Sequence, residues 1–278
     1  MGWRSVLAAL TAAVAIGATG CSAHGRHIGA GAAASPTVLT APSTSTSTVP
    51  QTTTSTTNPD NMLTIGSHSA RVAGLQAKLA SLGYRPGPAT GVYNESTASA
   101  VLAFQKREGL GRDGVAGPVV QAAILTPKGA GPRSGLPATR VEVDIARQIA
   151  FVVLGGQPVI TLNISSGSGM HYQDPQTKAD DVAYTPVGSF SVQRKIDKDV
   201  QAPLGTLHRP LYFYGGWAIH GSASVPPWPA SHGCVRVSNA DADWLFPQIP
   251  VGTPVIVYDA TGKSPAAGQA PAGAAPGS

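Results

Sequence analysis

Between positions 62 and 127, hydrophobic residues recur at intervals of three or four, which is typical of one face of an α-helix. Ser69 precedes the first such stripe as a suitable N-cap, and Gly83 follows it as a suitable stop. A second stripe runs through ESTASAVLAFQKREGL and ends at Gly109. A third helix is expected to start at Pro118, because proline is favoured at the first helical position. The pattern predicts a bundle of three helices. Its inward positions in the first two helices are Val72, Leu75, Leu79, Leu82, Ala100, Val101 and Phe104.

From position 139 the period of the pattern changes to two. In TRVEVDIARQIAFVVLGGQPVITLNISSG, apolar and polar residues alternate and β-branched residues are frequent, which predicts strands, with a turn at GGQP. Further strand-like runs are GSFSVQRKI, RPLYFYGGWAIHG and TPVIVYD. One short helix is expected after Ser238, because Asp241 stands three positions past this cap. The sequence therefore predicts a second domain over 139–259 that is mainly β.

The two ends of the chain differ in composition from these domains. Residues 1–21 combine Arg4, an apolar run too short to span a bilayer, and small residues before Cys21, which predicts an export signal. The ending ATGC resembles a bacterial lipobox and implies lipidation of Cys21, although Ala18 departs from the large aliphatic residue of that motif. An ordinary signal peptide cut nearby is the alternative. Residues 22–60, rich in Ser, Thr and Pro, predict a disordered linker, and 260–278 predict a disordered tail.

The charge balance and the cysteine count narrow the range of possible partners and cofactors. The chain of 278 residues has 19 Lys and Arg against 14 Asp and Glu, a net charge of +5, which suits proximity to a polyanionic wall or to anionic lipid. No basic stretch is interleaved with aromatic residues, and export makes nucleic acid an unexpected partner. The two cysteines lie far apart and form neither a disulfide framework nor a dense metal-binding pattern. We expect a monomer without a cofactor or a metal.

A lone thiol in an exported protein calls for an explanation. If Cys21 carries lipid, Cys234 has no partner, and it is either a buried structural residue or a reactive group. A thiol reacts as its thiolate, and a neighbouring base raises the thiolate fraction. Two bases are candidates: His232, two positions before the cysteine, and His220, fourteen positions before it. Spacing does not choose between them, and the two histidines with Cys234 also suffice for a zinc site. Gly233 permits a sharp turn and leaves backbone N–H groups open for an oxyanion.

The stretch SHGCVRVSN at 231–239, with AIHG upstream and YTPVGSF at 184–190, resembles the L,D-transpeptidases, the cysteine enzymes of peptidoglycan cross-linking. The resemblance implies that Cys234 is the nucleophile and His220 the general base and acid, oriented by a backbone carbonyl of Gly221 or Ser222. His232 remains the alternative base. The oxyanion site and its loop are implied to consist of Ser231, His232, Gly233 and Cys234. Substrate contacts are expected from Tyr212, Tyr214, Trp217, Arg236 and Asn239, with core packing or, for Arg236, a structural ion pair as the alternative reading.

Two features depart from that family pattern. Only ten residues separate His220 from Ser231, fewer than in some members, and Arg236 stands where some members have asparagine. Both departures put in doubt a detailed transfer of the cover over the substrate, for which SVPPWP suggests a compact and stiff segment.

The helical region has a resemblance of its own. LQAKLASLGY, TGVYNESTASAVLAFQKREGL and DGVAGPVVQAAI resemble the peptidoglycan-binding module of cell-wall enzymes, which implies that residues 62–127 bind the wall. The alternative is that the matching glycines and core residues only fold the bundle.

Together the two resemblances imply a reaction. Cys234 attacks the carbonyl of the third residue of a tetrapeptide stem, D-alanine leaves, and an amine of a second stem takes the acyl group to give a 3→3 cross-link. A thioester intermediate of this kind predicts covalent capture by carbapenem-type β-lactams. An L,D-carboxypeptidase, with water as acceptor, and a non-catalytic wall-binding lipoprotein are the alternatives. In all three cases the protein is expected outside the cytoplasm, anchored to the membrane and facing the wall.

Overall fold

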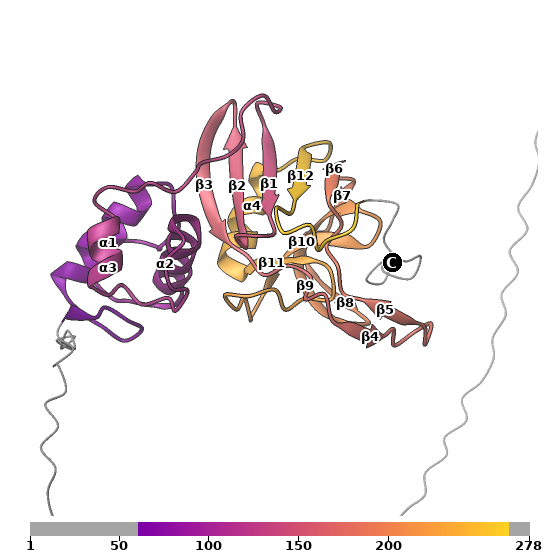
Figure 1. Cartoon of the computed structure of the whole chain (residues 1–278), viewed down its shortest axis with the longest axis horizontal. Helices are drawn as coiled ribbons and strands as arrows, with labels where there is room; N and C mark the ends of the chain where they lie inside the picture. Colours follow the sequence, from indigo (N-terminus) through magenta and orange to yellow (C-terminus); the bar gives the residue numbers. More distant parts are fainter. Residues whose placement is uncertain (1–60, 267–278) are drawn as a thin grey trace, which may run out of the picture. The chain divides into compact units, whose positions relative to one another are not determined.

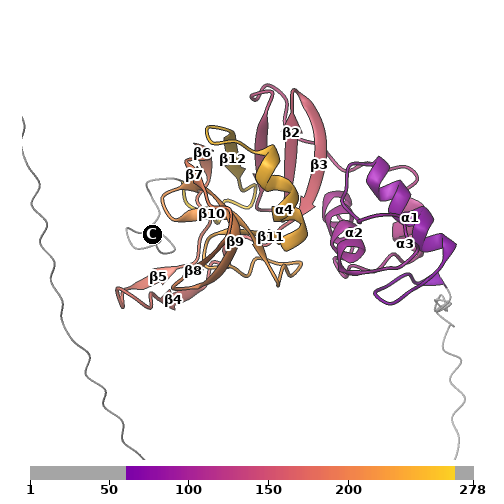
Figure 2. The ribbon, with the colours of Figure 1, turned by 180° about the vertical axis from the view of Figure 1, so that it is seen from behind.

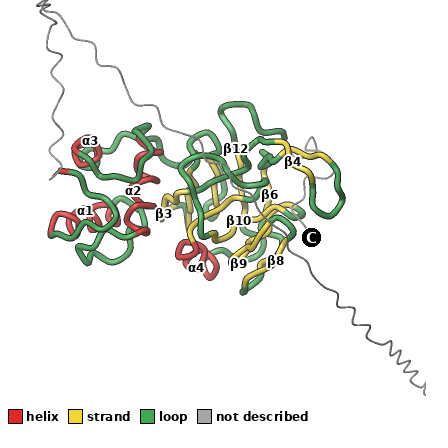
Figure 3. The backbone as a smooth tube through the Cα atoms, turned by 90° about the horizontal axis from the view of Figure 1, so that it is seen from below, coloured by secondary structure: helices red, strands yellow, loops and turns green. Residues whose placement is uncertain are grey.

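The computed structural model of the protein describes residues 61–266, all of which belong to one compact unit. The predicted signal sequence, the lipidation at Cys21 and the linker lie outside the described residues. Three helices come first, α1 (Ala70–Ser81), α2 (Glu95–Glu108) and α3 (Pro118–Ala123), and they group together in Figures 1 and 3. The strands and one further helix follow. None of the helices described is long and apolar enough to cross a membrane.

Local capping explains the ends of the three helices. The Ser69 hydroxyl accepts a hydrogen bond from the N–H of Val72 at the start of α1, and Gly109 ends α2 in the left-handed conformation. Pro118 occupies the first turn of α3, as predicted. The three helices enclose one apolar core. Its fully buried members include Val72, Leu79, Val101, Phe104 and Ala116.

Twelve strands and one helix make up the β domain. The strands are β1 (Arg140–Asp144), β2 (Ile149–Leu154), β3 (Gln157–Asn163), β4 (His171–Gln173), β5 (Asp180–Val182), β6 (Gly188–Ser191), β7 (Arg194–Lys195), β8 (Asp199–Ala202), β9 (Gly205–Tyr214), β10 (Trp217–Ser222), β11 (Val235–Ser238) and β12 (Pro254–Tyr258). One sheet has the order β3-β2-β1-β12-β6. A second has the order β11-β10-β9-β7, with β8 also pairing with β9, and β4 pairs with β5. Most pairs are antiparallel, but β1 with β12 and β10 with β11 are parallel.

The two larger sheets share one hydrophobic core with helix α4 (Asn239–Gln248). This core takes Val143, Val152 and Val257 from the first sheet, Phe213 and Ile219 from the second, and Leu245 from α4. Figure 2 shows α4 on the side of the β domain turned toward the reader. The predicted cap is present, because the Ser238 hydroxyl accepts from the N–H of Asp241 and donates to its carboxylate. This packing fixes the second sheet, and with it the segments that carry His220 and Cys234.

The structure differs from the predicted elements in three places. The run GSFSVQRKI is not one strand: β6 pairs with β12 and β7 with β9, so the chain changes sheets at Val192 and Gln193. Strand β1 is buried on both faces, whereas alternation predicted one exposed face. The predicted tail does not start at 260, because the N–H of Val187 donates to the carbonyl of Pro265 and the two segments form a bridge at Ala266. The remaining tail, 267–278, lies outside the described residues.

A buried lysine connects the helical domain to the β domain. Lys106 of α2 is 1% exposed, and its ammonium donates to Gln148 O at 3.1 Å, Asn163 Oδ1 at 2.5 Å and Ile164 O at 2.8 Å. Burial, with a smaller contribution from Arg112, lowers the pKa of Lys106 to about 7. Three oxygen acceptors match the three N–H bonds of an ammonium and offset the cost of burying it.

Three further contacts join the same domains. The Arg85 guanidinium pairs with the Asp241 carboxylate at 2.9 Å and lies over the ring of Trp244 at 4.8 Å from its centroid. The N–H of Thr161 donates to the carbonyl of Gly83 at 2.7 Å. Contacts from α2 and from the loop between α1 and α2 therefore join the two domains.

Replacing Lys106 by methionine is expected to lower the free energy of unfolding by about 3 kcal/mol, because two backbone carbonyls and the Asn163 amide oxygen lose their buried donor. For a chain of this size that loss corresponds to a fall in Tm of roughly 6–12 °C. Thermal unfolding followed by circular dichroism measures it. The matched control is Lys198→Met at an exposed position, which should leave Tm within about 1 °C. An equal Tm for both variants would contradict the structural role of Lys106.

Candidate active site

The parallel register of β10 and β11 brings the predicted site residues together. Ile219 pairs with Val235 and His220 with Arg236. Because side chains alternate along a strand, His220 and Arg236 point to the same face, and Cys234, one residue before β11, continues that face. All three residues line one cavity of about 290 Å³, with His232 and Ser231 at its wall. Two segments that are fourteen residues apart thus supply the thiol and the imidazole.

The tautomer of His220 follows from its hydrogen bond. Its Nδ1 lies 2.8 Å from the carbonyl oxygen of Gly221. A carbonyl only accepts, so Nδ1 carries the proton and the neutral ring presents the lone pair of Nε2. Burial lowers the pKa of His220 to about 4, with the positive charge of Arg236 acting in the same direction. The ring is therefore a neutral base with its basic nitrogen free for the cavity.

Position 221 has no room for a side chain, whereas the hydrogen bond from His220 needs only its backbone carbonyl. A Cβ at this position would lie 2.7 Å from Asn239 Oδ1 and 2.9 Å from a ring carbon of His208. The missing side chain lets the start of α4 approach β10 directly behind His220. Asn239 therefore packs against Gly221 and is absent from the wall of the cavity that holds Cys234. The substrate contact predicted for Asn239 is therefore not in the cavity of Cys234.

The thiol of Cys234 is 6% exposed and donates weakly to the carbonyl of Gly216 at 3.8 Å. Burial raises the pKa of the thiol to about 11, against the opposing effects of the Ala218 N–H and the Arg236 charge. The resting pair is thus a neutral thiol and a neutral imidazole. This differs from the expectation that a neighbouring histidine raises the thiolate fraction, because burial disfavours the charged form of both groups.

Hydrogen bonds hold the loop before Cys234 in a fixed conformation. The Ser231 hydroxyl donates to the carbonyl of Cys234 at 2.5 Å and accepts from the N–H of Gly233 at 3.0 Å. Ser231 itself is tied by its N–H to the carbonyl of Ser166. These hydrogen bonds agree with the supporting role in the loop that was expected of Ser231. The N–H of Gly233, in contrast, is occupied by Ser231 and is not an open donor, which corrects the expectation from sequence.

The loop turns at Gly233 because only glycine fits there. Its φ of +140° lies in a region that side chains disfavour, and a Cβ would lie 2.7 Å from Trp217 Nε1 and 2.9 Å from the carbonyl of Tyr184. The chain between His232 and Cys234 is therefore not a regular extended strand.

Two residues that support the cysteine loop, Tyr184 and Thr185, were not identified from the sequence. The Thr185 hydroxyl donates to the carbonyl of Gly233 at 2.6 Å, and Trp217 Nε1 donates to the carbonyl of Tyr184 at 3.0 Å. Tyr184 and Thr185 open the stretch YTPVGSF, which belongs to the family resemblance in the sequence but gave these two residues no role. Strand β6 does begin at Gly188, but the residues before it brace the cysteine loop. The signal that could have indicated these two residues is the presence of YTPVGSF in the family motif.

The remaining histidine and the arginine occupy different environments. The ring of His232 packs edge-to-face against Tyr172, with centroids 5.0 Å apart, and burial lowers its pKa. No carbonyl that would fix its tautomer contacts its ring nitrogens among the described residues. Arg236 is half-buried, and within residues 61–266 no carboxylate forms an ion pair with it. The structural ion pair considered as the alternative role of Arg236 is therefore absent from this part of the chain.

The aromatic residues expected to contact substrate lie mostly in the core. Trp217 is 5% exposed and stacks on Tyr214 with centroids 5.4 Å apart, and both pack in the main core rather than in the cavity of Cys234. Tyr212 is buried beside Cys234, with the guanidinium of Arg194 over its ring at 3.6 Å. Burial in the hydrophobic core leaves little of the Trp217 ring accessible to a substrate. Tyr214 is half-buried against that core, and its substrate contact stays a prediction.

The zinc alternative has no support in the geometry of residues 61–266. No group of three His, Cys, Asp or Glu side chains in this part of the chain is arranged to hold a metal ion.

Alkylation of Cys234 should be slow at neutral pH and accelerate strongly with pH. With a pKa of about 11, only ~10⁻⁴ of the thiol is ionised at pH 7, against ~3% for a free cysteine. In a Cys21→Ser variant, we expect iodoacetamide to react at least about 100-fold more slowly than with free cysteine at pH 7. The rate should still be rising at pH 10, where circular dichroism checks the fold. A plateau of the alkylation rate below pH 8.5 would show that the pKa of the Cys234 thiol is not raised.

Comparison with known proteins places this geometry in a family. Residues 138–257 match the YkuD family, described as the L,D-transpeptidase catalytic domain, and residues 68–124 match a family described as a putative peptidoglycan-binding domain. The crystal structure of an L,D-transpeptidase from Xylanimonas cellulosilytica is 43% identical, with a TM-score of 0.68, over 71% of this chain and 98% of that one. The chain belongs to the YkuD family of L,D-transpeptidases, and it joins that domain to a helical domain of the peptidoglycan-binding kind.

Two other relatives are more distant. A putative L,D-transpeptidase of Bacillus subtilis, YciB, is 27% identical over 135 residues, which is 42% of this chain and 64% of that protein. The match thus spans less than two thirds of the length of YciB. An L,D-transpeptidase structure from Stackebrandtia nassauensis is 21% identical, with a TM-score of 0.43, over 74% of this chain and 97% of that one.

Proposed function

We propose that the protein forms 3→3 peptidoglycan cross-links through a thioester on Cys234. The observation that carries the proposal is the single cavity lined by Cys234 and His220, in which the Gly221 carbonyl fixes the His220 tautomer with Nε2 as the base. Cys234 attacks the carbonyl of the third residue of a tetrapeptide stem. The stem's amide bond breaks, and D-alanine leaves as an amine.

The neutral resting pair defines how protons move in this proposal. His220 Nε2 takes the thiol proton as the sulfur attacks, so the thiolate exists only during the reaction and its charge passes to the substrate oxygen. The imidazolium then gives the proton to the leaving amine. In the second half, Nε2 takes a proton from the acceptor amine, which attacks the thioester and releases the thiol. His220 acts as base and acid in turn.

Other residues receive supporting roles. His232 lines the same cavity, but no carbonyl among the described residues fixes its tautomer, which favours His220 over His232 as the base. Because the Gly233 N–H is bound to Ser231, the oxyanion donors are proposed to be other N–H groups at or beside Cys234. Arg236, which lines the cavity without an ion-pair partner among the described residues, is placed to meet a carboxylate of the stem.

The setting of this reaction is proposed from the domains and the sequence. The helical domain binds the wall, and the whole chain acts outside the cytoplasm as a monomer. Cys21 is proposed to carry the lipid that anchors the chain to the membrane.

The direct test uses the purified protein with a disaccharide-tetrapeptide and mass spectrometry of the products. Release of D-alanine together with a dimer linked 3→3 supports the transpeptidase. Release of D-alanine with only a tripeptide product makes water the acceptor and the protein a carboxypeptidase. No release, and no mass gain with a carbapenem, favours a binding protein without catalysis.

A further inference from the structure

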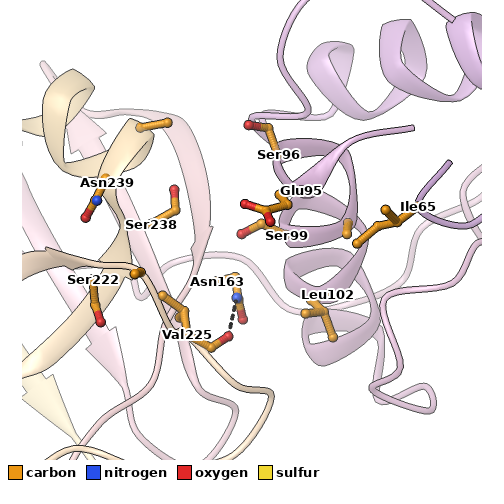
Figure 4. Close-up of a pocket in the computed structure, with 13 residues that line it drawn as sticks. Ile65, Glu95, Ser96, Ser99, Leu102, Asn163, Ser222, Val225, Ser238 and Asn239 are labelled. Atoms are coloured by element: carbon orange, nitrogen blue, oxygen red, sulfur yellow. Dashed lines mark hydrogen bonds between the residues drawn. The ribbon is translucent and has the colours of Figure 1, made fainter. Parts of the chain in front are cut away.

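A second cavity lies between the helical domain and the β domain. Figure 4 shows its two walls: Ser99 and Leu102 project from α2 on one side, and Ser222 and Val225 lie on the other. Its volume is about 550 Å³, within the ~300–1,000 Å³ of typical small-molecule sites. We call this cavity the interdomain cleft. Nothing in the proposed reaction uses it.

The walls of the interdomain cleft are held in place by buried polar contacts. Asn163 lines the cleft, its Oδ1 accepts from the buried Lys106, and its Nδ2 donates to the carbonyl of Val225 at 3.4 Å. One side chain therefore connects α2, the end of β3 and the segment after β10. The cleft is a preformed feature of the joined domains rather than a gap between independent ones.

The cleft adjoins the cavity of Cys234. Ser222 and Ala223 line both cavities, so the chain after β10 is their shared wall. A stem peptide extended from its sugar to its third residue spans only about 10 Å. A peptidoglycan strand acylating Cys234 must therefore keep its sugar close to this cavity, and the interdomain cleft is a neighbouring space of suitable size.

The chemistry of the lining indicates which part of the strand fits. Serine and asparagine side chains alternate with apolar patches at Ile65, Leu102 and Val225, and no Lys or Arg of the described residues lines the cleft. Within residues 61–266, Glu95 is the one ionisable residue that lines it. A stem peptide carries carboxylates, which would face Glu95 without a cation to pair with. N-acetylated sugars are uncharged, their hydroxyls donate to a carboxylate, and their methyl groups suit the apolar patches.

We propose that the interdomain cleft binds the N-acetylated glycan of the peptidoglycan strand whose stem enters the cavity of Cys234. The inference rests on the proposed function and adds a glycan site to which the helical domain and the β domain each contribute one wall. The helical domain then does more than attach the enzyme to the wall, because it orients the strand being cross-linked.

The test blocks the cleft with a large side chain and compares two acyl donors, one without a sugar and one with it. The donors are a free tetrapeptide and the same tetrapeptide on a glycan tetrasaccharide. The variants are Ser99→Trp on one wall and Ala240→Trp, at an exposed position of α4, on the other. Ala77→Trp, at an exposed position of α1, is the matched control, and Tm measurements check that each variant folds.

We expect the wild type to prefer the glycan-linked donor in kcat/KM by about tenfold, the factor given by one or two hydrogen bonds. Both cleft variants should lose this preference while their rates with the free tetrapeptide and with a carbapenem stay unchanged. Ala77→Trp should keep it. An unchanged preference in both folded cleft variants, or none in the wild type, would overturn the proposal. If the cleft variants instead raise the KM for the acceptor amine, the cleft is an acceptor site and the glycan assignment is wrong.

A binding measurement separates this inference from the reaction. Stem-free glycan chains should bind the wild type in calorimetry, and bind Ser99→Trp and Ala240→Trp about tenfold more weakly. If neither donor reacts with the wild type, the proposed function fails, while weaker glycan binding by the cleft variants would still support the site. Equal binding by all variants would exclude the site whether or not the protein is an enzyme.

Discussion

Cys234→Ser is expected to lower cross-linking and carbapenem acylation by a factor on the order of 10³ or more. The substitution keeps a small side chain in the buried position but replaces the thiol by a hydroxyl, whose proton is far less acidic. His220, with its pKa lowered to about 4 by burial, is too weak a base to remove that proton. Intact mass measures the effect: one carbapenem adduct per chain in the wild type and none in the variant.

Two controls make the Cys234→Ser result specific. Cys21→Ser should acquire the adduct at the wild-type rate, because the proposed nucleophile is intact. Binding to purified sacculi should be the same in Cys234→Ser and in the wild type, since the helical domain is unchanged. An adduct that persists in Cys234→Ser, or that depends on Cys21, would show that Cys234 is not the nucleophile.

Much of the architecture follows from local sequence. Ser69, Pro118 and Ser238 each mark the start of a helix because their effect on the backbone depends only on the next turn. The change of hydrophobic period near 139 likewise locates the first strand. The motif at 231–239 brought attention to Cys234 and His220, and the structure brings both to one cavity.

What the sequence did not indicate depends on contacts between distant segments. Lys106 reads as a solvated lysine on a polar face, yet its partners lie up to 58 residues away. Thr185 contacts Gly233 across 48 residues. The short strands β4, β5 and β8 have burial patterns without a long apolar run, so periodicity gives no signal. The lowered pKa of His220 and the raised pKa of Cys234 also follow from burial by the whole fold.

His220→Gln is expected to slow acylation by about 10²–10⁴-fold, the usual contribution of a general base. The more specific expectation is a change in the pH profile. In the wild type the neutral imidazole and the neutral thiol coexist between the pKa of His220, about 4, and that of Cys234, about 11. The acylation rate should therefore be nearly constant from pH 6 to 9. In the variant only pre-formed thiolate reacts, so the rate should rise about tenfold per pH unit.

The comparison among three histidines identifies the base. His68→Gln, at an exposed position of the helical domain, should behave as the wild type in rate and in pH profile. His232→Gln removes a ring that lines the cavity without a carbonyl to fix its tautomer among the described residues, and it should reduce the rate while keeping the flat profile. Loss of the flat profile in His232→Gln, with its retention in His220→Gln, would transfer the role of base to His232. A purely structural role for His220 would slow the reaction equally at every pH, because the route of the thiol proton would be unchanged.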